Sequence, residues 1–200
     1  MRGLQLKRWE IIQAFIDKFN YKRYLEIGIF RGKTFGHIRV AEKIGVDPRV
    51  VTDYKMDSDR FFREYHGCKF DIVFIDGCHN GDCVLRDAMN SMSICDDIIL
   101  MHDCKPTSEL TQMRENHPCR AKNMGTWHGT AWRAWLYLRS KLPYEMYVIE
   151  SDNGVGVINK RKKCVKTINY SLCLMEYVDF AKRQRELLNL ISVNEFLERI

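Results

Sequence analysis

Two aspartates and two histidines follow apolar runs of the chain, and their types suit proton transfer and the orientation of a hydroxylated ligand. Asp76 and His79 come after the run at 70–75, and His102 and Asp103 follow the next such run. Histidine can take a hydroxyl proton near neutral pH, and carboxylates accept hydrogen bonds from hydroxyl groups. The four side chains are therefore candidate catalytic residues.

Each of the two apolar runs predicts a parallel strand that is buried on both faces. Residues 70–75 are almost continuously apolar, and residues 98–101 repeat the pattern. Ligands of α/β sheets bind beyond the carboxyl ends of the strands. We therefore expect both strands to deliver their polar side chains to one edge of a sheet.

Cysteines lie among these candidates and raise the alternative of a zinc site. The chain has eight cysteines and no C-x-x-C pair, and the local spacing matches no common zinc motif. In a cytosolic chain, such cysteines are most simply reduced and partly buried. The ligands of this alternative site would come from Cys78, His79, Cys83, His102 and Cys104.

A glycine loop between a predicted strand and a predicted helix is the second chemical feature. Residues 24–27 predict the strand, a helix begins at Thr34, and Gly28 and Gly32 lie between them. Glycine allows a sharp turn and a close approach of the backbone to a ligand. The free N–H groups of the helix point into the same crevice. Such a unit at the start of an α/β sheet marks a cofactor site.

The glycine loop has several interpretations. Gly32, Lys33 and Thr34 match the end of a P-loop, but Gly28 and Gly32 enclose three residues where the motif needs four. The dinucleotide fingerprint G-x-G-x-x-G is absent. A third pattern, E-x-G-x-x-x-G beginning at Glu26, fits without adjustment. A purely structural turn is the remaining alternative.

The acidic glycine loop resembles the first motif of the class I S-adenosylmethionine-dependent methyltransferases, and the resemblance covers about residues 24–160. It implies a three-layer, Rossmann-like α/β fold whose seven-stranded, mostly parallel sheet is closed by an antiparallel β-hairpin. The pair Asn153-Gly154, between segments 144–150 and 155–159, is a strong hairpin signal. The implied cofactor is S-adenosyl-L-methionine.

The resemblance also assigns cofactor contacts along the chain. Asp47 ends a short predicted strand about twenty residues after Gly28, where α/β folds place an acid on the ribose hydroxyls; an Asp-Pro turn is its alternative. Ser58 and Asp59 match a segment that lies near the adenine in small bacterial and phage methyltransferases, whereas Ser58 could simply cap a helix. The predicted cofactor-binding residues are Glu26, Gly28, Gly32, Lys33, Thr34, Asp47, Ser58, Asp59 and Asp76.

The strand-end residues receive roles from the same resemblance. In catechol O-methyltransferase-like enzymes, acids at the places of Asp76 and Asp103 bind Mg²⁺, although Cys104 replaces the usual amide ligand here. His79 stands where that group carries its basic catalytic residue, and His102 is the competing base. The implied reaction is methyl transfer to a hydroxyl oxygen of a small molecule or glycan.

The rest of the chain predicts a single domain spanning residues 1–200. An N-terminal helix lies within residues 1–22 and either covers the sheet or acts as a lid, and residues 161–200 form a helical tail. Helices are expected at 8–19, 34–42, 82–93, 125–139 and 177–190, one more begins at Ser58, and a short third strand is expected at 54–57.

Composition narrows the function classes. A length of 200 residues suits one domain, and the net charge of +6 is dispersed, which does not favour a nucleic-acid partner. Residues 1–10 lack the apolar core of a secretory signal, and no apolar run reaches the length of a membrane span. We therefore expect a cytoplasmic enzyme with a small-molecule or glycan acceptor; its oligomeric state stays open. The alternatives are a P-loop-like phosphotransferase and a non-catalytic S-adenosylmethionine-binding protein.

Overall fold

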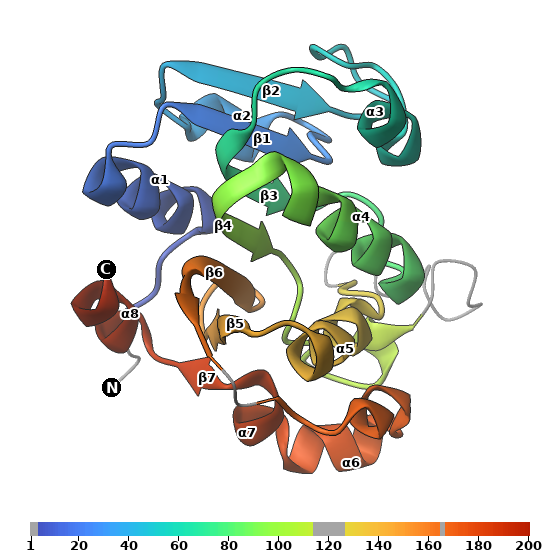
Figure 1. Ribbon diagram of the computed structural model, residues 1–200. Coiled ribbons are helices and arrows are strands. Elements are labelled where there is room, and N and C mark those ends of the chain that lie inside the picture. Colours follow the sequence, from blue (N-terminus) through green and yellow to red (C-terminus); the bar gives the residue numbers. More distant parts are fainter. Residues whose placement is uncertain (1–3, 114–126, 165–166) are drawn as a thin grey trace.

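The chain folds into a seven-stranded sheet between two layers of helices (Figure 1). The computed structural model describes residues 4–113, 127–164 and 167–200. Of the seven strands, β6 alone runs antiparallel to its neighbours, so the predicted Rossmann-like sheet with a closing hairpin is confirmed. The strands in spatial order are β2 (Glu42–Val46), β1 (Arg23–Ile27), β3 (Phe70–Ile75), β4 (Cys95–Met101), β6 (Val155–Lys163), β5 (Tyr144–Ile149) and β7 (Leu190–Ile191).

Each face of the sheet buries its own apolar core against helices. One core packs α3 (Ser58–Glu64), α4 (Gly81–Ile94), α5 (Ala131–Lys141), α6 (Tyr177–Lys182) and α7 (Gln184–Leu188) onto the sheet. The other core packs α1 (Arg8–Phe19), α2 (Lys33–His37) and α8 (Val193–Arg199) onto the opposite face. Short 3₁₀ turns at Leu110–Gln112 and Tyr170–Leu174 complete the described elements.

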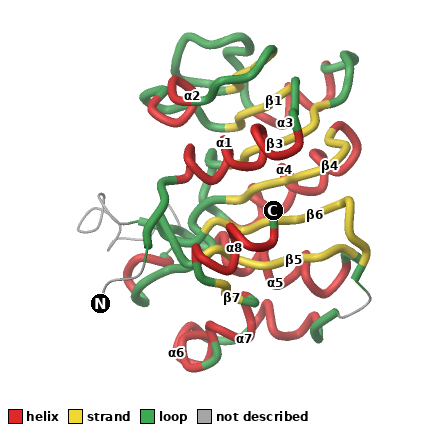
Figure 2. Tube along the Cα trace, turned by 90° about the vertical axis from the view of Figure 1, so that its left-hand side faces the viewer, coloured by secondary structure: helices red, strands yellow, loops and turns green. Residues whose placement is uncertain are grey.

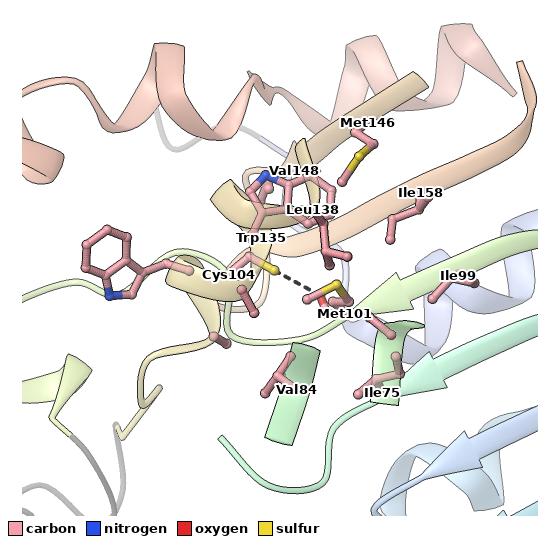
Figure 3. Packing of buried hydrophobic residues seen from close by; sticks show 14 of the residues in the cluster. Ile75, Val84, Ile99, Met101, Cys104, Trp135, Leu138, Met146, Val148 and Ile158 are labelled. Carbon is pink, nitrogen blue, oxygen red and sulfur yellow. Dashed lines mark hydrogen bonds between the residues drawn. The ribbon is translucent and has the colours of Figure 1, made fainter. Parts of the chain in front are cut away.

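The ends of β3 and β4 rest on a closely packed part of the first core (Figure 3). Ile75 and Met101 are the last residues of these strands, and Trp135 from α5 packs near them without solvent exposure. The Cys104 thiol also points into this core, where its Sγ atom lies 3.5 Å from the carbonyl oxygen of Met101. Dense packing of this kind gives the polar residues beyond the strands a rigid base.

The predicted third strand at 54–57 does not form. In the described structure this segment contributes one isolated parallel bridge, between Tyr54 and Val46. A parallel crossover needs a dozen or more residues, and the connection that starts at Pro48 is too short to supply them. This prediction was therefore wrong.

The C-terminal tail supplies the seventh strand instead. The helix predicted at 177–190 is broken into α6 and α7, and Asn189 adopts a left-handed conformation with φ of 53° that ends α7. The two residues of β7 then pair in parallel with β5. The sheet therefore has the expected number of strands but a different edge.

Two local predictions also need correction. Helix α2 ends at His37, short of the predicted end at 42, because Ile38 is extended and β2 already begins at Glu42. The cap of α3 is Asp57, whose side chain accepts a hydrogen bond from the backbone N–H of Arg60 at 2.8 Å. Ser58 is the first residue inside that helix, so it does not cap it.

Within the described part of the chain, no helix has both the length and the apolar character needed to cross a membrane.

Candidate functional site

A cavity of about 600 Å³ runs along the carboxyl ends of β2, β1, β3 and β4. Figure 2 shows the loops that continue from these strand ends. Val46, Asp47 and Ser58 line the part of the cavity nearest β2, and Asp76 and Asp103 line the part beyond β3 and β4. The cavity therefore lies where α/β sheets bind their ligands.

Gly28 brings the glycine loop into direct contact with the loop after β3. Its φ is +91°, and a Cβ atom added there would lie 2.4 Å from the carbonyl oxygen of Asp76 and from the Cα atom of Gly77. No side chain fits at this place, so the close approach of the two loops requires glycine. Gly32 also has a positive φ, +71°, and precedes the first residue of α2.

The Asp47 carboxylate is held by four backbone N–H groups. Its Oδ2 atom accepts from Ile29 at 3.0 Å and from Phe30 at 2.9 Å, and its Oδ1 atom accepts from Arg49 at 2.7 Å and Val50 at 3.2 Å. Burial favours the protonated acid, but these bonds outweigh it and lower the pKa of Asp47. Asp47 thus joins the glycine loop to the turn after β2.

Four of the nine predicted cofactor residues line the cavity: Gly28, Asp47, Ser58 and Asp76. Glu26 is 1% exposed and accepts a hydrogen bond from the Tyr24 hydroxyl. Its burial raises the pKa of its carboxyl to about 8. The structure places the remaining predicted cofactor residues, Gly32, Lys33, Thr34 and Asp59, outside the lining.

Lys33 and Asp59 make contacts of their own away from the cavity. The Lys33 ammonium lies 4.9 Å from the centre of the Trp9 ring on α1, in cation–π contact. Asp59 forms an ion pair with Arg86 on α4, at 3.1 Å. Lys33 therefore does not have the position of a P-loop lysine over the cavity.

Asp87 on α4 is a buried acid in the cavity wall that the sequence analysis did not single out. It is 2% exposed, and its side chain forms a hydrogen bond with Ser58. Burial raises the pKa of Asp87 to about 6. Position 87 falls within a predicted helix, and burial of an acid on that helix depends on its packing against α3, which spacing alone does not show.

The residues predicted at the ends of β3 and β4 form one side-chain cluster. His102 Nδ1 lies 3.2 Å from Asp76 Oδ1 and 3.2 Å from Asp103 Oδ1. His79 Nδ1 lies 3.1 Å from Asp103 Oδ2, and its Nε2 lies 3.5 Å from Asp76 Oδ1. The structure therefore brings together all four candidates from two separate strand ends.

Arg8 and Asp152 extend this cluster, and neither was identified from the sequence. The Arg8 Nη1 atom lies 2.5 Å from Asp76 Oδ2, and its Nε atom lies 2.9 Å from Asp152 Oδ2. The His102 Nε2 atom is 4.0 Å from the same Asp152 oxygen. Arg8 is the first residue of α1, and Asp152 belongs to the hairpin turn between β5 and β6.

Opposite charges set the protonation of the cluster. Burial lowers the pKa of His102, but Asp103 and Asp76 outweigh it and raise that pKa to about 10. The same balance raises the pKa of His79. Burial acts to raise the pKa of Asp76 and Asp103, yet the neighbouring cations leave both below their usual value. At neutral pH His102 is therefore an imidazolium between carboxylates.

The ring of His79 is fixed by the segment that precedes α5. It stacks on Trp127 with ring centres 4.8 Å apart and planes 14° apart. The backbone N–H of Thr130 donates to the His79 carbonyl oxygen at 2.8 Å. A Cβ atom on Gly129 would lie 2.1 Å from that oxygen, so the contact needs glycine. Trp127 itself lines the cavity.

His128 differs from its two histidine neighbours because it is neutral. It is 1% exposed, and burial lowers its pKa, an effect that the charge of Asp103 offsets only in part. It is not among the residues that line the cavity.

The alternative zinc site does not assemble. Cys104 is buried in the apolar core and burial raises the pKa of its thiol, so the thiolate that zinc needs is disfavoured there. Among the described residues, the group with ligand atoms close enough to share a metal ion is Asp76, His102 and Asp103, and it includes no cysteine.

Comparison with known proteins supports the fold. No family model matches the chain, and no curated protein sequence matches it. Among solved structures, cofactor-bound Rv0187 from MTB aligns with a TM-score of 0.56 at 12% identity, over 82% of this chain and 84% of that chain. An O-methyltransferase from Bacillus cereus, in complex with SAH, aligns with a TM-score of 0.54 at 12% identity, over 76% and 80% of the two chains.

This chain has the class I methyltransferase fold. A further similar structure is the O-methyltransferase TomG from Streptomyces achromogenes in complex with SAM, with a TM-score of 0.51 at 12% identity, over 76% and 79% of the two chains. The methyltransferase fold agrees with the family resemblance found in the glycine loop, and it places the cavity described above at the edge where such sheets bind ligands.

Proposed function

We propose that the protein transfers a methyl group from S-adenosyl-L-methionine to a hydroxyl oxygen of a small molecule or glycan. The proposal rests on one observation. Gly28, Asp47 and the charged cluster at the ends of β3 and β4 line the same cavity. A glycine loop for the cofactor and a proton acceptor for the substrate thus open into one space. The bound cofactor supplies the activated methyl group.

His79 is the proposed general base and acts from its neutral form, although Asp76 and Asp103 raise its pKa as they raise that of His102. Its side chain is 20% exposed and lines the cavity, whereas the side chain of His102 is 2% exposed. His102, with a pKa raised to about 10, keeps its proton at neutral pH and therefore stabilises the carboxylates instead of accepting a proton. Asp76 and Asp103 hold the His79 ring from two sides and orient the acceptor hydroxyl.

Asp47, Ser58 and the cavity wall nearest β2 are the proposed site of the adenosine half of the cofactor. Asp47 has four backbone donors, which together match the four acceptor positions of a carboxylate. Contact with the ribose hydroxyls therefore requires that a hydroxyl share or replace one of these donors. In this proposal Asp47 also shapes the loop that surrounds the ribose.

The acceptor is proposed to enter from the side of the hairpin turn. A second cavity of about 460 Å³ lies there, and Asn153 lines both cavities. The other residues that line this second cavity include the polar side chains of Gln5, Lys105, Glu150 and Asn194. Polar walls with both donors and acceptors suit a hydroxylated small molecule or a sugar.

The residues present fit Mg²⁺ poorly. Mg²⁺ demands near-octahedral oxygen ligands, whereas the candidate group offers one imidazole nitrogen from His102 with the oxygens of Asp76 and Asp103. One Asp76 oxygen already faces Arg8, and the other faces His102 and His79. The proposed reaction therefore has no step through Mg²⁺.

The proposal is tested first by ligand binding. S-adenosylhomocysteine should raise the melting temperature, with a stabilisation of about 2.7 kcal/mol at a hundredfold excess over its dissociation constant. ATP with Mg²⁺ should not, because Lys33 contacts Trp9 and not the cavity. Stabilisation by ATP with Mg²⁺, and none by S-adenosylhomocysteine, would instead support the phosphotransferase.

Turnover separates the enzyme from a non-catalytic binding protein. His79→Ala should bind S-adenosylhomocysteine as tightly as the wild type. With a panel of hydroxylated acceptors, it should form S-adenosylhomocysteine from S-adenosylmethionine about 10²–10⁴-fold more slowly than the wild type. His37→Ala is the matched control, because that histidine stacks on Trp9 with ring centres 4.7 Å apart and does not line the cavity. Equal rates in both variants would remove His79 from the chemistry.

A further inference from the structure

We propose that Arg8 supplies a permanent positive charge to the charged cluster at the ends of β3 and β4. Because of this charge, the site excludes a divalent metal ion and works without one. The inference rests on the proposed function, because it concerns how that site balances its charges. We assign Arg8 a positioning role that acts through its contact with Asp76.

The guanidinium of Arg8 bridges two carboxylates that come from separate strand ends. Nη1 lies 2.5 Å from Asp76 Oδ2, while Nε and the backbone N–H of Arg8 lie 2.9 Å and 2.8 Å from Asp152 Oδ2. The three side chains are between 12% and 23% exposed, so solvent screens these pairs only in part. A planar guanidinium that joins two acids in this way has a fixed place in the site.

The positions that a metal ion would need at Asp76 are already taken. Its Oδ2 atom faces Arg8, and its Oδ1 atom lies 3.2 Å from His102 Nδ1 and 3.5 Å from His79 Nε2. A divalent ion between Asp76 and Asp103 would therefore have to displace nitrogen groups from the first carboxylate. It would also stand close to the permanent positive charge of Arg8, which repels it.

The N-terminal segment is attached so that Arg8 cannot easily leave. The backbone N–H of Leu6 donates to Ser151 Oγ at 2.8 Å, and that hydroxyl donates to the Leu6 carbonyl oxygen at 2.6 Å. The segment before α1 is thereby joined to the same hairpin turn that carries Asp152, and α1 lies along the flank of the sheet (Figure 1). Helix α1 is thus a cover for the sheet that also delivers a charge to the cavity.

A matched pair of variants tests the proposal by direct metal binding. Arg8→Met removes the cation and keeps an unbranched side chain, whereas Arg23→Met removes an arginine that is similarly exposed, at 25%, and pairs with Glu42 at 2.9 Å. Free Mn²⁺ is measured by electron paramagnetic resonance in titrations of each protein. We expect Arg8→Met to bind Mn²⁺ at least about tenfold more tightly than the wild type, and Arg23→Met to match the wild type.

Arg8→Lys keeps the positive charge and should therefore bind Mn²⁺ almost as weakly as the wild type. A purely structural role of Arg8 would not explain this result. Mn²⁺ binding by the wild-type protein, or equal Mn²⁺ affinities of the wild type and Arg8→Met, would overturn the proposal. The wild-type titration alone decides the matter if Arg8→Met does not fold. Binding of S-adenosylhomocysteine is followed in the same samples: its absence from the wild type would contradict the proposed function, whereas the Mn²⁺ titrations judge the role of Arg8 separately.

Discussion

Glu26 on β1 and the aspartates beyond β3 and β4 are all buried acids near one edge of the sheet, yet their ionisation is opposite. Burial raises the pKa of Glu26 to about 8, and the Tyr24 hydroxyl that faces it only moderates the effect. Burial acts on Asp76 and Asp103 in the same direction, but the histidines and Arg8 reverse its result. Burial alone therefore neutralises an acid in this fold, and a neighbouring cation keeps it charged.

This difference divides the edge of the sheet into two parts. Glu26 backs the glycine loop as a largely protonated group at neutral pH. The cluster of Asp76, Asp103 and His102 instead holds fixed charges in the cavity wall, where they can act on a bound hydroxyl group. Three substitutions test whether partners or burial cause the contrast.

The largest effect is expected when the His102 imidazolium is removed from the cluster. His102→Phe leaves Asp76 and Asp103 buried beside each other without the imidazolium between them, and breaking a buried pair in this way typically costs about 3–5 kcal/mol. His128→Phe is the matched control, because that buried histidine is already neutral, and its loss should be clearly smaller. Urea denaturation near pH 7 gives both values.

The same pair of variants has a defined pH dependence. Since the pKa of His102 is raised from 6.5 to about 10 on folding, its stabilising effect is fully present below about pH 6.5 and is lost as the pH rises through about 10. The stability gap between the wild type and His102→Phe should therefore narrow in alkaline buffers. A gap that is equal for His102→Phe and His128→Phe at every pH would show that packing, not charge, determines it.

The next largest effect concerns Glu26. Because its pKa rises from 4.5 to about 8 on folding, the wild type loses stability as the pH climbs through that interval. Glu26→Gln cannot ionise, so its stability relative to the wild type should improve by about 2–3 kcal/mol between about pH 6 and about pH 9. A constant difference across this range would mean that Glu26 is charged throughout.

The smallest effect is expected at Asp87, whose pKa rises from 3.8 to about 6 on folding. Asp87→Asn should gain about 1–1.5 kcal/mol relative to the wild type between about pH 5 and about pH 8. Asp96→Asn serves as the control, because that acid lies on the exposed beginning of β4 and pairs with Lys69 at 3.3 Å. The two variants are compared by thermal unfolding in matched buffers, and identical trends would place Asp87 in contact with solvent.

The sequence predicted the parts of this molecule that depend on local pattern and on the order of strands. The strand at Phe70–Ile75 and the helix at Arg8–Phe19 have the predicted bounds. Because parallel strands end at one edge, the same reasoning brought His79 and Asp103 together, although they are carried by different strands.

Other features depend on three-dimensional packing that spacing does not contain. Arg8 and Asp152 meet only because the N-terminal segment crosses to the hairpin turn, at a sequence separation of 144 residues. Lys33 follows the glycine loop as a P-loop lysine would, yet the direction of its side chain is set by Trp9 on another helix. The failed third strand, by contrast, had a local cause, the short connection after Pro48.

The irregular segment that replaces this strand has a consequence for how the protein behaves among its own copies. Along the outer side of β2, the backbone N–H of Tyr54 donates to the Gly45 carbonyl oxygen at 3.1 Å, and Asp53 Oδ2 accepts from the Gly45 N–H at 2.8 Å. At the opposite rim, β7 is only two residues long. Neither rim of the described sheet presents a long row of free peptide groups, so fibrous, edge-to-edge growth between molecules is disfavoured even in concentrated solution.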